Sequence, residues 1–257
     1  MLELQNLSKS YRGIPAISNV NFRVNAGEVV GYLGANGSGK STTVKIITGL
    51  LQPSEGRVLF EGRNIRDDLA SFRGALGYVP EEAHLYTYLS GFEYLQLVGR
   101  LRGLGERQIQ IKATRLLQLL GLESWRYSPI SMYSKGMKQR VLIGAALMHD
   151  PKLLIFDEPL SGLDVLSSRL FKDLLLELTA AGKAVLYISH VLEVVEQICS
   201  RVVVIARGKI LADASPAELT GRTEFSDLES VFAHLVQQED TKSLAHELVE
   251  AIKVQNA

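Results

Sequence analysis

A glycine-rich segment between a strand-like run and a helix-like run restricts the fold of this chain most strongly. Residues 34–41 read Gly-Ala-Asn-Gly-Ser-Gly-Lys-Ser, after the apolar run 29–33 and before the helical run 42–49. Glycines let the backbone turn tightly and aim its N–H groups inward, where they can hold phosphate oxygens. The following helix adds its N-terminal dipole. This strand–loop–helix order predicts a phosphate-binding site in an α/β protein.

The members of the loop have distinct expected tasks. Lys40 supplies a positive charge for the β- and γ-phosphates, and the Ser41 hydroxyl supplies a ligand for Mg²⁺. The other expected nucleotide contacts are Gly34, Asn36, Gly37, Ser38, Gly39 and Thr42. The cofactors that this loop predicts are therefore ATP and Mg²⁺.

Two carboxylates follow a second apolar run. Residues 153–156 are Leu-Leu-Ile-Phe, and Asp157 and Glu158 come directly after them. Because ligands of α/β sheets lie beyond the carboxyl ends of the strands, this pair is expected to face the nucleotide. Asp157 can hold Mg²⁺, directly or through water, and Glu158 can orient or deprotonate the attacking water. The alternative is an ordinary acidic cluster at a helix N-terminus.

Strand-like and helix-like patterns alternate along the chain. The runs 29–33, 153–156, 184–188 and 202–206 are nearly all apolar, as in strands buried on both faces of a mostly parallel sheet. The runs 2–4, 21–24 and 57–60 alternate more, as in an antiparallel sheet with one wet face. The predicted fold class is α/β, with a phosphate-loop NTPase core, an N-terminal antiparallel β subdomain and an inserted helical subdomain.

The same patterns suggest a division into domains. We expect one nucleotide-binding domain over residues 1–220, with the helical subdomain at about 83–140, and a short helical tail over 221–257. In the subdomain, Ile109, Leu116, Leu117 and Leu120 recur at helical spacing, and Gly121 is expected to end that helix. The tail has two apolar stripes, which are Leu228, Val231, Phe232, Leu235 and Val236, and then Leu244, Leu248 and Ile252.

Composition narrows the possible classes of protein. Lys plus Arg and Asp plus Glu both number 28, so no net charge attracts polyanions, which argues against a dedicated nucleic-acid binder. Cys199 is the only cysteine, which excludes an intrachain disulfide. The N-terminus lacks the apolar stretch of a signal peptide, and the apolar runs are far shorter than the ~20 residues of a membrane span. We therefore expect a protein that reaches a membrane only by docking on a partner.

Five ordered motifs together resemble the ATP-binding-cassette ATPases. They are the loop 34–41, the segment 133–140 (Tyr-Ser-Lys-Gly-Met-Lys-Gln-Arg), the pair Asp157-Glu158, the loop 161–164 (Ser-Gly-Leu-Asp) and His190. The resemblance covers about residues 1–220. It implies an ATPase in which two subunits meet head to tail, so a second ATPase subunit, as a homodimer, is an expected partner. Each ATP would lie between the phosphate loop of one subunit and the signature segment, residues 133–137, of the other.

The resemblance also implies tasks for individual residues. Ser134 and Gly136 match signature positions that contact the γ-phosphate across the dimer, although the usual family sequence is Leu-Ser-Gly-Gly-Gln. Asp164 would help to form the dimer contact. His190 matches the switch histidine that hydrogen-bonds the γ-phosphate, with Lys40 and Glu158 as the other catalytic candidates.

Two further positions carry alternatives. Tyr11 matches the aromatic residue that stacks on adenine, and ordinary packing is the other interpretation. Glu81 stands where the family usually has a glutamine that contacts Mg²⁺ and water, and its carboxylate adds negative charge near the ion. Ser41, Asp157 and Glu81 are thus the expected metal ligands.

Two uses of the ATP energy remain open. The first is a transport ATPase on the cytoplasmic face of the cell membrane, docked on a separate integral permease. In this respect the chain resembles bacterial drug- or polysaccharide-exporter subunits. Aromatic residues in the segments 85–89 and 92–94 would suit docking on a permease, or packing within the subdomain. The second is a soluble mechanical ATPase acting on ribosomes or DNA. The single cassette, the single cysteine and the lack of a heptad run favour transport.

Overall fold

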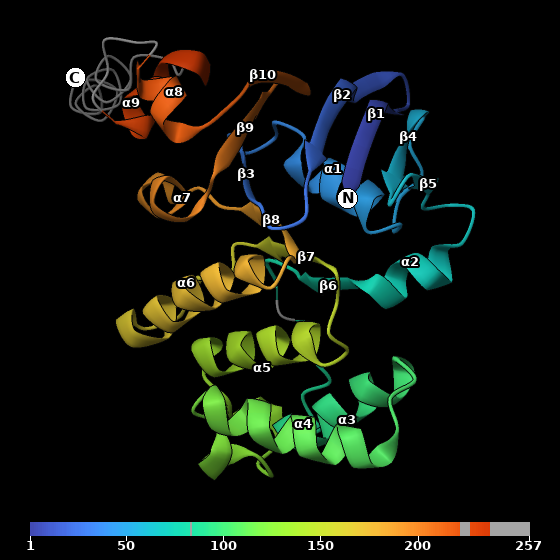
Figure 1. Cartoon of the computed structure of the whole chain (residues 1–257), viewed down its shortest axis with the longest axis vertical. Coiled ribbons are helices and arrows are strands. Elements are labelled where there is room, and N and C mark those ends of the chain that lie inside the picture. The colour runs from blue at the N-terminus through green and yellow to red at the C-terminus, as the bar shows by residue number, and fades with distance from the viewer. Residues whose placement is uncertain (83, 222–226, 237–257) are drawn as a thin grey trace, which may run out of the picture.

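The computed structural model of the protein describes residues 1–82, 84–221 and 227–236. Two sheets form its centre, with helices below and beside them (Figure 1). The first is antiparallel, in the order β2-β1-β4-β5. Its strands are β1 (Leu2–Tyr11), β2 (Ile14–Val24), β4 (Glu55–Phe60) and β5 (Arg63–Asn64).

The second sheet is mostly parallel and has the order β10-β9-β3-β8-β7-β6. Its strands are β3 (Val29–Leu33), β6 (Leu76–Val79), β7 (Leu153–Asp157), β8 (Ala184–Ile188), β9 (Arg201–Ala206) and β10 (Lys209–Ala214). Only β10 runs antiparallel to its neighbour β9, and the other four pairs are parallel. The phosphate loop follows β3, and the carboxylate pair lies at the end of β7, so the parallel order brings both to one edge of the sheet.

Helices cover both sheets and form the lower part of Figure 1. They are α1 (Lys40–Ile47), α2 (Leu69–Ala75), α3 (Gly91–Leu101), α4 (Glu106–Leu119), α5 (Lys135–Leu147), α6 (Val165–Ala180), α7 (Leu192–Ile198), α8 (Pro216–Gly221) and α9 (Leu228–Val236), with the 3₁₀ turns Glu123–Trp125 and Ile130–Met132. Within the described residues, no helix is long and apolar enough to cross a membrane.

The parallel strands bury both of their faces. On β7, Ile155 packs into the core shared with the antiparallel sheet and α1, whereas Leu154 and Phe156 pack against α5, α6 and α7 on the other side. Neighbouring side chains on a strand point to opposite faces, so a strand between two cores needs apolar residues throughout. The continuous apolar runs in the sequence have this cause, and the predicted α/β fold class is confirmed.

A third core lies among α3, α4 and α5. Helix α4 ends as its sequence predicts, because Gly121 has a φ of 66° and its N–H donates to the carbonyl of Gln118. The N–H of Leu122 then donates to the carbonyl of Leu117, which completes a Schellman motif with both leucines fully buried.

The domain division stays a prediction. Helix α5 continues past residue 140 to Leu147 and packs both on α3 and on β6, so its contacts join the helical part to the core. Residues Leu228 to Leu235 of the first tail stripe belong to α9. The second stripe, Leu244, Leu248 and Ile252, lies outside the described residues.

Candidate functional site

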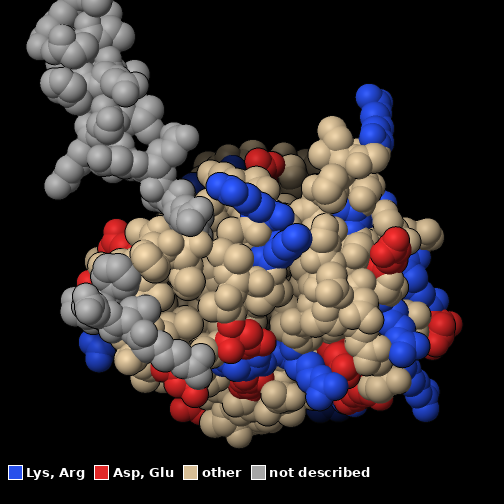
Figure 2. Space-filling view, turned by 90° about the horizontal axis from the view of Figure 1, so that it is seen from above, with Lys and Arg blue, Asp and Glu red and all other residues tan. Residues whose placement is uncertain are grey.

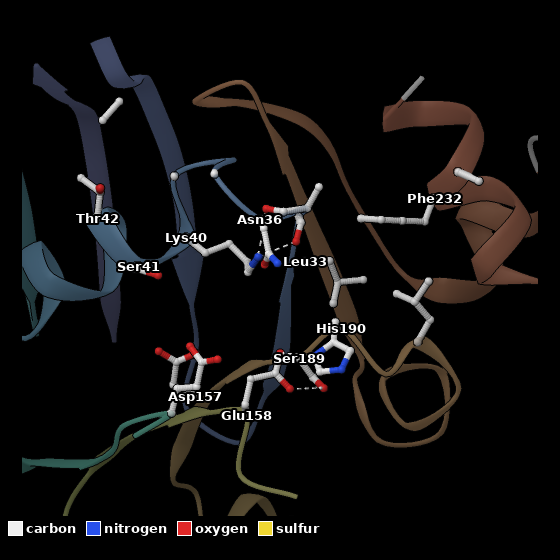
Figure 3. A pocket seen from close by; sticks show the side chains of 18 of the residues that line it. Leu33, Asn36, Lys40, Ser41, Thr42, Asp157, Glu158, Ser189, His190 and Phe232 are labelled. Atoms are coloured by element: carbon white, nitrogen blue, oxygen red, sulfur yellow. Dashed lines mark hydrogen bonds and ion pairs between the residues drawn. The ribbon is translucent and has the colours of Figure 1, made fainter. Parts of the chain in front are cut away.

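A cavity of ≈ 640 Å³ lies at the carboxyl edge of the parallel sheet. Most of the residues predicted as ligands line it, namely Gly34, Asn36, Gly37, Gly39, Lys40, Ser41, Thr42, Glu81, Asp157, Glu158 and His190. Figure 3 shows that the side chains of Lys40 from α1, of Asp157 and Glu158 at the end of β7, and of His190 after β8 approach one another. This volume is within the usual range for small-molecule sites.

The phosphate loop is shaped by glycine at its junction with α1. Gly39 has a φ of 110°, and a Cβ there would lie 2.5 Å from Cγ2 of Ile17. A residue with a side chain would therefore be strained both by its backbone and by its neighbour. The loop thus stays tight enough to direct its N–H groups and the N-terminus of α1 at the cavity.

The Lys40 side chain forms hydrogen bonds with the backbone of its own loop. Its Nζ donates to the carbonyl of Gly34 at 2.5 Å and to that of Ala35 at 3.1 Å. Partial burial lowers the pKa of Lys40, and the carboxylates of Glu158, Asp157 and Glu81 oppose that shift. The ammonium is therefore held at the mouth of the loop, where phosphate oxygens can replace the carbonyls as its acceptors.

Asp157 lies in an excess of negative charge. Burial, followed by the nearby carboxylates of Glu81 and Glu158, raises the pKa of Asp157 to about 6, although Lys40 acts in the opposite direction. A divalent cation would relieve this excess, and the hydroxyl of Ser41 with the carboxylates of Asp157 and Glu81 gives the oxygen donors that Mg²⁺ prefers. The described residues contain no group of three His, Cys, Asp or Glu side chains that would hold a metal alone. Mg²⁺ in proteins is usually held by one or two carboxylates together with water and substrate phosphates.

Glu158 is fixed by its backbone and by two side chains. Its φ of 48° lies in the region that favours glycine, and its N–H donates to the carbonyl of Ile188 at 2.9 Å. Its Oε1 lies 2.7 Å from Nδ1 of His190, and Ser189 Oγ donates to its Oε2 at 3.3 Å. Strain of this kind persists only where the surroundings hold it. The carboxylate is therefore aimed at the cavity by the end of β8.

Ser134 and Gly136 do not line this cavity. Ser134 is exposed at the start of α5, where its Oγ accepts the N–H of Met137 at 3.2 Å. A Cβ on Gly136 would lie 2.4 Å from the carbonyl oxygen of Gly162, so only glycine fits between α5 and the loop 161–164. Tyr133, a departure from the family pattern, is buried and donates from its hydroxyl to the carbonyl of Trp125 at 2.7 Å.

Two other predicted residues also do not line the cavity. Tyr11 is 46% exposed at the end of β1, with Nζ of Lys9 5.5 Å from its ring centroid. Ser38 lies within the loop, but its Oγ is buried and has no hydrogen-bond partner.

The cavity also contains residues that the sequence did not predict. They are Ala16, Leu33, Ala35, Ser189, Leu192, Glu229, Phe232 and Ala233. Ser189 could have been inferred from its place beside His190. The α9 residues carried no signal, because Phe232 looks like an ordinary member of an apolar stripe.

Comparisons with known proteins agree with this geometry. The sequence model of the ABC transporter family matches residues 17–161. The chain is 40% identical over 210 residues to the uncharacterized ABC transporter ATP-binding protein YxlF of Bacillus subtilis, covering 82% of this chain and 69% of the relative. It is 36% identical over 222 residues to the linearmycin resistance ATP-binding protein LnrL of the same species, covering 86% and 71%.

Solved structures show the same arrangement. An ATP-binding subunit of an ABC transporter superposes with a TM-score of 0.86 at 32% identity, covering 91% of this chain and 99% of that one. The ATP-binding cassette MJ0796, solved as a dimer bound to ADP and Pi after hydrolysis, superposes with a TM-score of 0.78 at 28% identity, covering 84% and 98%.

Proposed function

Because the chain belongs to the ABC transporter family and is an ATPase of that family, we propose that it hydrolyses Mg-ATP in a head-to-tail homodimer. We propose further that it drives a separate membrane permease as an exporter subunit. One observation carries the dimer: neither Ser134 nor Gly136 lines the cavity of its own chain. Ser134 is exposed and Gly136 is partly buried at the start of α5, and a helix start is suited to hold a phosphate that a second chain can supply.

In this proposal the residues of the cavity have different chemical roles. Lys40 and the loop N–H groups hold the β- and γ-phosphates. Ser41, Asp157 and Glu81 would hold Mg²⁺, which supplies positive charge to the phosphate oxygens when it is bound. Glu158 accepts a proton from the attacking water, and His190 holds the γ-phosphate beside it. The partner's signature segment completes the site.

Exposed aromatic side chains on the helical part support docking on a permease. Tyr86 and Tyr88 are 55% and 75% exposed, and their ring centroids are 6.0 Å apart. Tyr86 also lies 6.4 Å from Tyr94, so the three rings form one group. Aromatic residues at a surface are typical of protein interfaces. A chain docked there would work at the cytoplasmic face of the cell membrane, where ATP is available.

The name of one relative supports export as the direction of transport. LnrL is described as a resistance protein, which fits removal of a compound from the cell, and we extend that direction to this chain. Nucleic acid is not a proposed partner. Basic and acidic side chains are interspersed on the face shown in Figure 2, in agreement with the equal totals of both charges.

Two measurements test this function. The chain should co-purify with an integral membrane protein from detergent-solubilised membranes, and the triple change of Tyr86, Tyr88 and Tyr94 to Ser should abolish that association without lowering its ATPase activity. Stimulation of the ATPase by DNA, RNA or ribosomes, with the steep loss in salt that phosphate contacts cause, would instead support a soluble mechanical ATPase.

A further inference from the structure

The nucleotide cavity extends beyond the phosphate loop to the C-terminal helix α9. Glu229, Phe232 and Ala233 line it together with Asn36 and His190. Figure 3 shows Phe232 pointing from α9 toward Asn36, on the opposite side of the cavity from Thr42 and Asp157. In the proposed function the phosphates bind at the Asp157 side, which leaves the α9 side for a further occupant.

Helix α9 presents this face from a fixed position. Leu228 and Val231 are each 1% exposed and pack into the core that also contains α7. Glu229 and Ala233 are exposed, and Phe232 is partly buried. The face at the cavity is therefore held by the core and does not depend on its occupant.

The candidate occupant is a segment that contacts the start of α5, where the signature segment lies. Gly136 closely contacts Gly162, and Nζ of Lys135 donates to Oγ of Ser161 at 2.7 Å. The loop 161–164 must therefore accompany Ser134 wherever that residue docks. Directly after this loop come two exposed apolar side chains, Val165 at 85% and Leu166 at 79%.

We propose that, in the ATP-bound dimer, the face of α9 formed by Phe232 and Ala233 receives Val165 and Leu166 of a second copy of this chain. The proposal rests on the proposed head-to-tail dimer. When the partner's Ser134 reaches the phosphates, the loop attached to it comes to the same cavity, and in this proposal its two apolar residues meet the α9 face. Each contact occurs twice in a two-fold symmetric dimer. Burial of these side chains then contributes to closure of the dimer around ATP.

Cross-linking between separately labelled chains tests the contact. All chains carry Glu158→Gln, to retain ATP, and Cys199→Ala. One pool adds Ala233→Cys and the other Val165→Cys, and the mixed pools are treated with a short bifunctional maleimide. We expect a covalent dimer with Mg-ATP, at least tenfold more abundant than with ADP or in either pool alone.

The possible results separate the two proposals. A dimer with Mg-ATP on a sizing column that gives no covalent product would overturn the α9 contact and leave the proposed dimer intact. A chain that binds Mg-ATP but stays monomeric would overturn both. A covalent product of equal yield with ADP would show that the contact does not belong to the ATP-bound state and would contradict the proposal.

A matched pair of variants distinguishes the contact between chains from the packing of α9 on its own core. Phe232→Ala and Leu235→Ala each shorten a partly buried α9 side chain on the same core, but only Phe232 lines the cavity. In the Glu158→Gln background, Phe232→Ala should weaken ATP-dependent dimerisation by roughly tenfold, and Leu235→Ala by much less. Leu166→Ala should weaken dimerisation as much as Phe232→Ala does. The double variant should dimerise no more weakly than either single variant, because both changes remove the same contact. Equal weakening by Phe232→Ala and Leu235→Ala would contradict the contact.

Discussion

Oε1 of Glu158 and Nδ1 of His190 lie 2.7 Å apart, which joins the ends of β7 and β8 at the cavity. The Glu158 side chain is 13% exposed, whereas that of His190 is 78% exposed. The largely buried carboxylate thus positions the exposed imidazole at the cavity. In the proposed function the same carboxylate is also the base for the water molecule that attacks the nucleotide. One residue therefore serves two purposes, and substitutions can separate them.

Glu158→Gln should slow ATP hydrolysis by about 10²–10⁴-fold, the usual contribution of a general base. The amide keeps the shape and can still bond His190, but it cannot take a proton. ATP binding should survive, because Lys40 and the loop hold the phosphates. Single-turnover hydrolysis and equilibrium ATP binding measure the two effects. A variant that hydrolyses ATP at the wild-type rate would remove Glu158 from this role.

Glu158→Gln should also produce a dimer with Mg-ATP on a sizing column, and no dimer with ADP. Loss of the carboxylate removes a negative charge that faces the γ-phosphate, so the closed state is favoured. Ser134→Arg in the same chain should abolish the dimer while ATP stays bound to monomers. If the protein remains monomeric when saturated with ATP, the head-to-tail arrangement is wrong.

His190→Ala and Glu158→Gln should not be additive. Because the two side chains are in direct contact, removal of either disrupts the same unit, and the double variant should be about as slow as the slower single variant. The three rates are compared at saturating ATP. A double variant whose loss equals the product of the two single losses would show that the pair acts independently.

Much of this site could be predicted from residues that are close in sequence. The loop 34–41 and the pair Asp157-Glu158 each follow an apolar run, and the carboxyl ends of parallel strands meet at one edge. The family and the ATPase activity that these motifs indicated are confirmed. The part played by α9 could not be predicted, because its approach to the cavity depends on how Leu228 and Val231 pack more than 180 residues after the loop. Apolar spacing shows which face of a helix is buried, but not which neighbour the other face meets.

Glu81→Gln should preserve most of the ATPase activity, and Glu81→Ala should lose a substantial part. Glu81 lines the cavity and its charge adds to that around Asp157. Glutamine keeps an oxygen for Mg²⁺ or water and removes one negative charge, whereas alanine removes the ligand. Activity is titrated against Mg²⁺, and the alanine variant should need more of the ion. Identical curves for wild type and Glu81→Ala would place the residue outside the reaction.

Tyr11→Ala should weaken ATP binding by roughly 1–3 kcal/mol, the range for a base stacked on an aromatic ring. Tyr11 is half exposed at the end of β1, so its ring is available for stacking. Tyr11→Phe should be nearly silent because the ring remains. Calorimetric titration of each variant measures the affinity. Unchanged binding by a folded Tyr11→Ala protein would favour simple packing of this ring.

His149 should make the fold less stable in mild acid. Its Nε2 donates to the carbonyl of Leu76 at 3.0 Å, and its buried Nδ1 has no partner. Burial, followed by the charges of Arg102 and Lys112, lowers the pKa of His149 to about 4, although Asp150 opposes the shift.

The direction of the effect follows from the two states of His149. The unfolded chain, with a pKa near 6.5, binds the proton more readily between about pH 6.5 and 4 than the folded chain does. The folded state therefore loses stability as the pH falls through this window, by about 2 kcal/mol at pH 5. His149→Gln removes the titrating group. When the pH falls from 7.5 to 5, the urea-unfolding free energy of wild type should therefore decrease by about 2 kcal/mol relative to that of the variant. His84→Gln is the control, because the His84 side chain is 82% exposed and its difference from wild type should stay nearly constant. A constant difference for His149→Gln as well would show that His149 does not destabilise the fold in acid.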